Sequence, residues 1–392
     1  MMKQAVILAA GEGQRLRPFT VNRPKVMLGI AGRPVLQYAV EALAASGVRD
    51  IILVVGYRKE QVIDAMGSGE QFGVNLAYVT QEQQLGTAHA LAQARPMVKG
   101  DFLVLPGDNL IEPDTIAHFA AVAPDAVLVK RVDDPQRYGV VTVERGMVKK
   151  VVEKPEETRS NLVSTGIYAF NRDIFEFIEP DLDLPDVLNR AIQSGCRIKA
   201  VETDGTWLDA IYPWDILNLN AAVLGKITDS SSGVIEAGAY LKGPVVVGKD
   251  TVIRSNSYIV GPAAIGDGCD IGPGVCIFPA TSLGDNVVVA PFTQVKNSVV
   301  GNDVNIGPGC TIEDSVIDQG CVIQGHFTAC CGESEVAVNH GLHRVRVGAM
   351  LGEGCQVGNG VVAQPGVMVG NYAQIQPLKL ISGRLPDRSL VL

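Results

Sequence analysis

The sequence lacks any excess of basic residues. Its 392 residues include 33 Lys and Arg against 42 Asp and Glu, which gives a formal net charge of −9. A protein that binds nucleic acid or an anionic membrane through its overall charge needs the opposite balance. We therefore expect neither nucleic acid nor a membrane as a partner, and local cationic loops must supply any attraction for phosphate.

The sequence also has no two cysteines at the C-x-x-C spacing and no apolar run long enough to cross a membrane. Its eight cysteines therefore indicate neither a zinc site nor a disulfide framework. The N-terminal stretch MMKQAVILAAGEG has too few apolar residues before its first glycine to be a signal peptide. These features predict a protein of the reducing cytoplasm.

The first half of the chain alternates short apolar runs with amphipathic patterns, which predicts a mostly parallel Rossmann-like sheet with helices on both faces. Ligands of such sheets bind beyond the carboxyl ends of the strands. The expected strands are QAVILAA (4–10), DIILVVGY (50–57), VNLAYVTQ (74–81) and DFLVLPGD (101–108), and the expected helices are RPVLQYAVEALAASGV (33–48) and GTAHALAQARPMV (86–98).

The second half has a different pattern, in which an aliphatic residue recurs every six positions. This period fits neither a helix nor one long strand and is typical of a hexapeptide-repeat left-handed parallel β-helix, whose aliphatic side chains stack inward. We expect domains at 1–226 and 227–392. The repeating positions are Ile235, Leu241, Val247, Ile253, Ile259, Ile265, Ile271, Ile277, Leu283, Val289 and Val295, then, after one-residue slips, Val300, Ile306, Ile312, Ile317 and Ile323, and finally Val345, Leu351, Val357, Ala363, Val369 and Ile375.

A glycine-containing loop, LAAGEGQRLRPFTVNRPK (8–25), follows the first expected strand. A dinucleotide fingerprint would need a third glycine where Leu16 stands, and a P-loop would need its Lys directly after the last glycine. A plain turn with solvated arginines is the structural alternative. The cations favour a phosphate-binding loop, in which Gly11 and Gly13 admit phosphate close to backbone N–H groups while Arg15 and Lys25 supply charge.

This loop resembles the signature of the sugar-1-phosphate nucleotidylyltransferases, G-x-G-x-R-L followed at a distance by P-K. Further motifs of that family follow in its order over residues 4–220: QEQQLGTAHAL (81–91), PGDNL (106–110), RYGVV (137–141), VEKP (152–155), STGIYAF (164–170) and WLDAIYPWDIL (207–217). The resemblance implies transfer of a nucleotidyl group from UTP or dTTP to a hexose or N-acetylhexosamine 1-phosphate, with release of pyrophosphate.

The same resemblance implies roles for individual residues. Arg15 and Lys25 would be catalytic, and Asp108 and Asp209 would bind one Mg²⁺, although Ile211 replaces the glycine that the family usually has after the second aspartate. A turn aspartate on the surface is the structural alternative for Asp108. Tyr168 fits core packing better than ligand contact. The substrates would contact Leu8, Gly11, Gly13, Gln81, Gly86, Thr87, Gly139, Glu153, Lys154 and Gly166.

The repeat domain resembles the C-terminal half of bifunctional family members, which also acetylate glucosamine-1-phosphate from acetyl-CoA. His326 stands where that activity would place its general base, but Ala329 replaces the aromatic residue that the family has three positions later. Two hypotheses stay open: an acetyltransferase that uses acetyl-CoA, or a scaffold that associates as a homo-oligomer, a trimer or a dimer of trimers.

Overall fold

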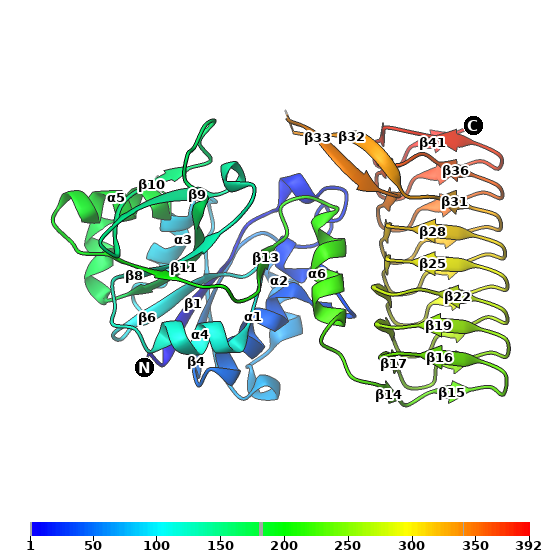
Figure 1. The fold of residues 1–392 in the computed structure, drawn as a ribbon, viewed down its shortest axis with the longest axis horizontal. Coiled ribbons are helices and arrows are strands. Elements are labelled where there is room, and N and C mark those ends of the chain that lie inside the picture. Colours follow the sequence, from blue (N-terminus) through cyan, green and yellow to red (C-terminus); the bar gives the residue numbers. More distant parts are fainter. Residues whose placement is uncertain (1, 180–182, 340) are drawn as a thin grey trace. The chain divides into compact units, whose positions relative to one another are not determined.

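The computed structural model describes residues 2–179, 183–339 and 341–392 (Figure 1). The chain forms two compact units. Unit 1 comprises residues 1–12, 23–27 and 35–209, and unit 2 comprises residues 13–22, 28–34 and 210–392. The N-terminal segment therefore alternates between the units before it enters the first long helix.

Unit 1 is built on a nine-stranded mixed sheet. Strands β5, β4, β1 and β6 are parallel neighbours, and β11 runs antiparallel to β6 and β8. In order across the sheet the strands are β5 (Asn75–Thr80), β4 (Asp50–Val55), β1 (Gln4–Ala9), β6 (Phe102–Pro106), β11 (Leu162–Phe170), β8 (Ala126–Arg131), β12 (Lys199–Glu202), β10 (Met147–Glu153) and β9 (Gly139–Glu144). A separate antiparallel pair joins β7 (Asn109–Ile111) to β13 (Trp207–Asp209).

Helices cover both faces of this sheet, as the alternating sequence pattern predicts. Successive side chains of a strand point to opposite faces, and in β1 Ile7 joins one apolar core whereas Val6 joins the other. The first core is shared with α1 (Val35–Ala45), α2 (Lys59–Met66) and α4 (Pro113–Ala120), and the second with α3 (Thr87–Gln93) and α5 (Leu184–Gln193). Short 3₁₀ turns are η2 (Lys25–Met27), η3 (Glu70–Phe72), η4 (Pro135–Arg137) and η5 (Arg172–Phe177).

Unit 2 contains the predicted left-handed parallel β-helix, made of three parallel sheets. The first sheet holds β14 (Ser230–Ser231), β17 (Val245–Val247), β20 (Ala263–Ile265), β23 (Thr281–Leu283), β26 (Val299–Val300), β29 (Val316–Ile317), β34 (Met350–Leu351), β37 (Met368–Val369) and β40 (Arg384–Leu385). The second holds β15 (Val234–Ile235), β18 (Val252–Ile253), β21 (Asp270–Ile271), β24 (Val288–Val289), β27 (Asn305–Ile306), β30 (Val322–Ile323), β35 (Gln356–Val357), β38 (Gln374–Ile375) and β41 (Leu390–Val391). The third holds β16 (Tyr240–Lys242), β19 (Tyr258–Val260), β22 (Cys276–Ile277), β25 (Gln294–Lys296), β28 (Thr311–Glu313), β31 (Thr328–Ala329), β36 (Val362–Ala363) and β39 (Leu380–Ile381).

The six-residue pattern places its aliphatic residues in one continuous core inside the coils. The register pairs Val247 with Ile265 one full coil later, and Leu283 with Val300 across a coil that is one residue shorter. This shorter coil explains the slip in the sequence pattern. Burial of each stacked aliphatic side chain contributes roughly 1.5–3 kcal/mol, so the ladder stabilises every coil against its neighbours.

The expectation that the repeat returns at Val345 was wrong. Val345 lies in an antiparallel hairpin formed by β32 (Gly332–Val338) and β33 (Gly341–Val347), where it pairs with Ser334. The ladder skips this hairpin and continues from Ile317 to Leu351. Val345 precedes Leu351 by six residues, as the repeat requires. Its side chain nevertheless belongs to β33 of the hairpin, whose residues alternate with period two.

Unit 2 also includes η1 (Gln14–Leu16), the two-stranded ribbon of β2 (Gly29–Ile30) and β3 (Arg33–Pro34), and α6 (Asp215–Leu224). Helix α6 packs on β23 and β26 of the β-helix and on β2. In the described part of the chain, every helix is too short or too polar to span a bilayer.

Candidate nucleotide-binding site

A cavity of about 490 Å³ opens in unit 1 beyond the carboxyl ends of β1 and β6. Parallel strands that end at one edge of a sheet bring the loops that follow them together there. Sequence-predicted residues that line the cavity are Leu8, Gly11, Lys25, Gln81, Gly86, Thr87, Asp108, Glu153, Lys154 and Gly166.

The other predicted residues lie outside the cavity lining. Gly139 stands next to it, because β9 and β10 pair Gly139 with Glu153. Gly13, Arg15 and His326 belong to unit 2, where Gly13 has φ +74° and Arg15 is exposed.

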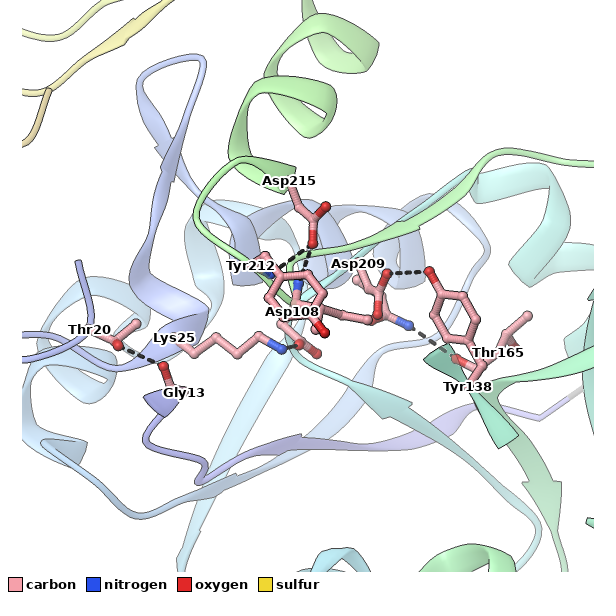
Figure 2. A network of polar contacts seen from close by, with 11 residues as sticks. Gly13, Thr20, Lys25, Asp108, Tyr138, Thr165, Asp209, Tyr212 and Asp215 are labelled. Atoms are coloured by element: carbon pink, nitrogen blue, oxygen red, sulfur yellow. Dashed lines mark hydrogen bonds and ion pairs between the residues drawn. The ribbon is translucent and has the colours of Figure 1, made fainter. Parts of the chain in front are cut away.

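Lys25 and Asp108 form an ion pair inside unit 1, between Nζ and Oδ2 (Figure 2). Their side chains are only 22% and 15% exposed, and both line the cavity. An ion pair that is largely screened from water is held more firmly than one on the surface. The cavity therefore contains a cation and a carboxylate in fixed positions beside each other.

Asp209 reaches the same region of unit 1 through strand pairing, because it lies opposite Asn109, the residue after Asp108. Its Oδ1 accepts a hydrogen bond of 3.1 Å from the Tyr138 hydroxyl, which orients the carboxylate (Figure 2). Asn109 is itself buried and donates to the Thr165 carbonyl at 3.2 Å. Thus β7, β13 and β11 together fix the two aspartates.

These two carboxylates fit the requirements of Mg²⁺, which binds proteins through one or two carboxylates and takes its remaining ligands from water and substrate phosphates. Among the described residues, no group of three or more His, Cys, Asp and Glu gathers into a complete protein metal site. If Mg²⁺ bound to these two carboxylates, water and substrate phosphates would supply its remaining ligands.

The Gln81 side chain is buried at the cavity and held by the start of α3. Its Nε2 donates to the Gly86 carbonyl at 3.1 Å and contacts His89 Nδ1 at 2.9 Å. These two contacts use both amide hydrogens and fix which way the amide faces. The Oε1 atom can therefore still accept a hydrogen bond.

At the opposite wall, Glu153 ends β10 and Lys154 follows it, and the two form an ion pair of 3.0 Å between Oε1 and Nζ. A Cβ at Gly139 would lie 3.1 Å from Glu153 Oε2, so the glycine gives the carboxylate its space. Gly166 has φ +76°, and a Cβ there would come within 2.9 Å of Pro106, another residue of the lining.

Tyr168 is a fully buried member of the second core that also touches the cavity. Burial raises the pKa of its hydroxyl to about 12, with the negative charges of Glu153 and Asp183 adding to the effect and the Ser164 hydrogen bond opposing it. The hydroxyl is therefore neutral at physiological pH. Tyr168 thus packs in the core and also borders the cavity, so the expectation that it serves in packing rather than in ligand contact stays a prediction.

Sequence reasoning missed two polar residues of the cavity, Gln84 and Asp183. Gln84 Nε2 donates to the Ala10 carbonyl at 2.8 Å, and Asp183 Oδ1 accepts from the Thr87 backbone N–H at 2.8 Å and from its hydroxyl at 3.0 Å. Asp183 precedes the apolar pattern of α5, where an aspartate is expected simply to cap the helix. Its contact with Thr87 therefore left no sign in the sequence.

A third missed residue is Asp215, buried at the start of α6 in unit 2. Its Oδ2 accepts from the backbone N–H groups of Ile211 and Tyr212, at 2.9 and 2.8 Å (Figure 2). It thereby fixes the turn that follows Asp209, where Ile211 replaces the glycine of the family pattern.

In the β-helix, His326 occupies an exposed corner between β30 and β31, with φ +59°. A Cβ at Gly309 would come within 2.8 Å of its Nδ1, so the ring lies over the preceding coil. Ala329 points into the core, where it pairs in register with Ile312 and Ala363.

The cavity at the carboxyl ends of the strands, the glycine-containing loop and the Lys25–Asp108 pair are the features expected of a nucleotide-binding transferase. The profile of the nucleotidyl transferase family matches residues 4–224, and that of the GMPPB C-terminal domain matches residues 241–343. The chain therefore belongs to the nucleotidyl transferase family.

Relatives extend over both units. The bifunctional protein GlmU of Methanococcus vannielii is 36% identical over 99% of this chain and 97% of its own. A bifunctional sugar-1-phosphate nucleotidylyltransferase/acetyltransferase of Sulfurisphaera tokodaii is 32% identical over 95% of this chain and 96% of its own. A solved structure from Bacillus anthracis, provisionally named glucose-1-phosphate thymidylyltransferase, is 29% identical with a TM-score of 0.53, and covers 59% of this chain and 98% of its own.

Proposed function

We propose that this sugar-1-phosphate nucleotidylyltransferase transfers a nucleotidyl group from UTP or dTTP to a hexose or N-acetylhexosamine 1-phosphate. The observation that carries the proposal is the Lys25–Asp108 ion pair in a cavity that Gln81 borders on one side and Glu153 on the other. An attacking phosphate oxygen of the sugar phosphate forms a bond to the α-phosphorus, and the bond to the pyrophosphate leaving group breaks. Positioning and electrostatic stabilisation suffice for this step.

The cationic groups act on the phosphates in this proposal. Lys25 is a point charge close to the reacting phosphates, and Arg15 forks onto the β- and γ-phosphates. Asp108 and Asp209 would hold Mg²⁺, which when bound neutralises phosphate charge. Gly11 and Gly13 let backbone N–H groups approach the phosphate oxygens.

Gln81 supports the choice of a uracil or thymine base. With both amide hydrogens engaged, its Oε1 accepts from a ring N–H, which uracil, thymine and guanine have and which adenine and cytosine lack at their pairing edge. Gly86 and Thr87 begin α3 beside it, and Leu8 lines the cavity with them. The resemblance favours the pyrimidines over guanine.

The sugar phosphate is assigned to the opposite wall. Glu153 can accept from two sugar hydroxyls, and Lys154 can pair with the phosphate. Gly139 and Gly166 would assist because neither has a side chain that would displace Glu153 or Pro106. We further propose a nucleotidyltransferase domain at 1–226 and a β-helix domain at 227–392. The protein would act in the cytoplasm, as its eight free cysteines fit.

A second activity is supported by the relative from Sulfurisphaera tokodaii, whose name includes an acetyltransferase. His326 would then deprotonate the amine of glucosamine-1-phosphate, which attacks acetyl-CoA and releases the CoA thiolate. The alternative is a scaffold that forms a trimer or a dimer of trimers. Thiol release from acetyl-CoA by the parent and by His326→Ala separates the two, because only an acetyltransferase loses activity in the variant.

A panel of sugar-1-phosphates, each with UTP and with dTTP, tests the main proposal through pyrophosphate release. We expect release that depends on both substrates and is fastest for one pair. Release without any sugar phosphate, or none with any pair, would contradict the assignment.

A further inference from the structure

The segment that carries the cationic loop is divided between the two units. Residues 23–27, which include Lys25, belong to unit 1, whereas the residues on both sides, 13–22 and 28–34, belong to unit 2 with the β-helix. The covalent flanks of Lys25 are therefore packed with the β-helix coils. This raises the question of what holds each flank.

Glu353 of the β-helix holds the first flank through Asn22. Asn22 Nδ2 donates to Glu353 Oε2 at 2.9 Å and reaches the Tyr372 hydroxyl at 3.4 Å. Glu353 Oε1 accepts from the Tyr372 hydroxyl at 2.9 Å and from Gln319 Nε2 at 3.3 Å. Residues from three coils of the β-helix thus meet at the carboxylate that accepts from Asn22. The hydrogen bond to Glu353 raises the pKa of the Tyr372 hydroxyl.

Asn371 makes a second tie to the same flank. This side chain is 2% exposed, and its Nδ2 donates to the Pro18 carbonyl at 3.2 Å. Its Oδ1 accepts from the Glu353 backbone N–H at 2.8 Å, so the two tying residues are themselves connected. A buried amide with all these contacts made is costly to move.

Asn220 of α6 ties the second flank. Its buried Oδ1 accepts from the Ala31 backbone N–H at 3.0 Å and from the Ser282 hydroxyl at 2.8 Å. Its Nδ2 donates to the Ala280 carbonyl at 2.9 Å. One amide therefore links the β2–β3 ribbon to a coil of the β-helix.

The first flank is also rigid within itself. The Thr20 hydroxyl, fully buried, donates to the Gly13 carbonyl at 2.7 Å, and the same carbonyl accepts from the Leu16 N–H at 2.9 Å. The hydrogen bonds that restrain Asn22 and Pro18 therefore also restrain the turn that carries Arg15.

We propose that Asn22, Glu353 and Asn371 are positioning residues for nucleotidyl transfer, through which the β-helix holds the triphosphate-binding loop in its binding conformation. The inference rests on the proposed role of Gly11–Lys25 in triphosphate binding. A loop fixed in advance binds its ligand without the entropic cost of ordering it. Loss of a tie therefore weakens binding of the nucleoside triphosphate and not of the sugar phosphate.

The test compares Asn22→Ala and Glu353→Ala with the parent in the full chain. Each variant should raise KM for UTP, or for dTTP where that is the faster substrate, about tenfold, as expected when a hydrogen bond to a charged group is lost. KM for the sugar phosphate should stay within about twofold. The double variant should show no more than the larger single effect, because both changes remove the same contact.

Asp285→Ala is the matched control. Asp285 occupies the corner position equivalent to Glu353 in an earlier coil. Its Oδ1 accepts a cross-coil hydrogen bond of 2.8 Å from the Asp267 N–H, as Glu353 Oε1 accepts one from Gln319 Nε2, but Asp285 has no described hydrogen bond to the loop. It should leave both KM values unchanged.

A second check is Asn371→Asp, which keeps the oxygen that accepts from Glu353 and loses the Nδ2 donor to Pro18 and to Asp387 Oδ1. It should also raise KM for the nucleotide, and thermal unfolding measured in parallel shows whether the new carboxylate beside Asp387 disturbs the fold.

Nucleotide KM values equal to the parent's in Asn22→Ala and Glu353→Ala would overturn the proposal. So would an equal rise in Asp285→Ala, because that would indicate general loosening of the β-helix. Lys25→Ala, assayed in parallel, distinguishes failure of the positioning inference from failure of the proposed role of the loop. If it loses turnover while the tie variants do not change, only the positioning inference fails; if it too behaves as the parent, the role of the loop itself fails.

Discussion

The ammonium group of Lys25 is paired with the Asp108 carboxylate at a cavity in which both side chains are mostly screened from water. Each partner charge is compensated by the other. A phosphate that enters brings negative charge to the lysine, and a divalent cation brings positive charge to the aspartate. Ligands can thus replace this internal pair without leaving an uncompensated charge.

Lys25→Ala is expected to lower kcat for pyrophosphate release by about a hundredfold or more, since the reacting phosphates lose a preorganised positive charge. Circular dichroism should show an unchanged fold. Lys59→Ala removes a lysine from an exposed ion pair with Glu82, of 3.4 Å, in the same unit and should leave kcat unaltered. Turnover of Lys25→Ala at the parent rate would refute the role of this residue.

Removal of divalent metal should abolish turnover, and added Mg²⁺ should restore it. Asp209→Asn keeps the shape of the side chain and loses its charge, so the Mg²⁺ concentration for half-maximal rate should rise about tenfold, the cost of about 1.4 kcal/mol of binding. Asp204→Asn, in an exposed loop five residues earlier, is the control. Full activity in the presence of a chelator would exclude the proposed metal.

Gln81→Leu should raise KM for the nucleoside triphosphate about tenfold, because the nucleobase loses its hydrogen-bond acceptor. KM for the sugar phosphate should not change. The matched control is Gln83→Leu, an exposed position in the same loop. Equal nucleotide KM values in both variants would place the base elsewhere.

Stability above pH 10 tests the environment of Tyr168. An unfolded tyrosine titrates near 10, whereas burial raises the folded pKa to about 12. Between these values the unfolded chain has released the proton and the folded chain has not, so the free energy of unfolding falls as pH rises. The full loss is about 3 kcal/mol, and below pH 10 this contribution is fully present.

Tyr168→Phe should lack this component of the pH dependence, as measured by urea unfolding at pH 9 and at pH 11.5. Tyr258→Phe, on a partly exposed position of the β-helix, should follow the parent. An identical slope in parent and Tyr168→Phe would show that the hydroxyl ionises without cost.

The periodic parts of the fold could be predicted because their signal is local. Every coil of the β-helix repeats one constraint, an aliphatic residue facing inward, and the buried parallel strands β1, β4 and β6 of unit 1 are apolar runs. The hairpin of β32 and β33 could not be anticipated, because Val345 matches the repeat by spacing while its neighbours follow a strand pattern.

The loop pattern and the family resemblance singled out Lys25 and Asp108, and the structure brings the two side chains together at one cavity. The site was not predictable where a residue acts through a distant partner. Asp183 contacts Thr87 across 96 positions, and Asn22 contacts Glu353 across 331. Such pairs depend on how loops meet in three dimensions, and no local period encodes that meeting.

The hairpin of β32 and β33 is inserted between β31 and β34, and the coil that precedes it still pairs in register with the coil that follows it, as with Ile317 and Leu351 or Ala329 and Ala363. The extra sequence at this corner leaves the register of the coils unchanged. One residue inserted within a coil strand would instead turn the strand's inward side chains to solvent. The corner that carries the hairpin is therefore a place where evolution or an engineer can graft a new segment, whereas the coils between β17 and β29 vary by a single residue.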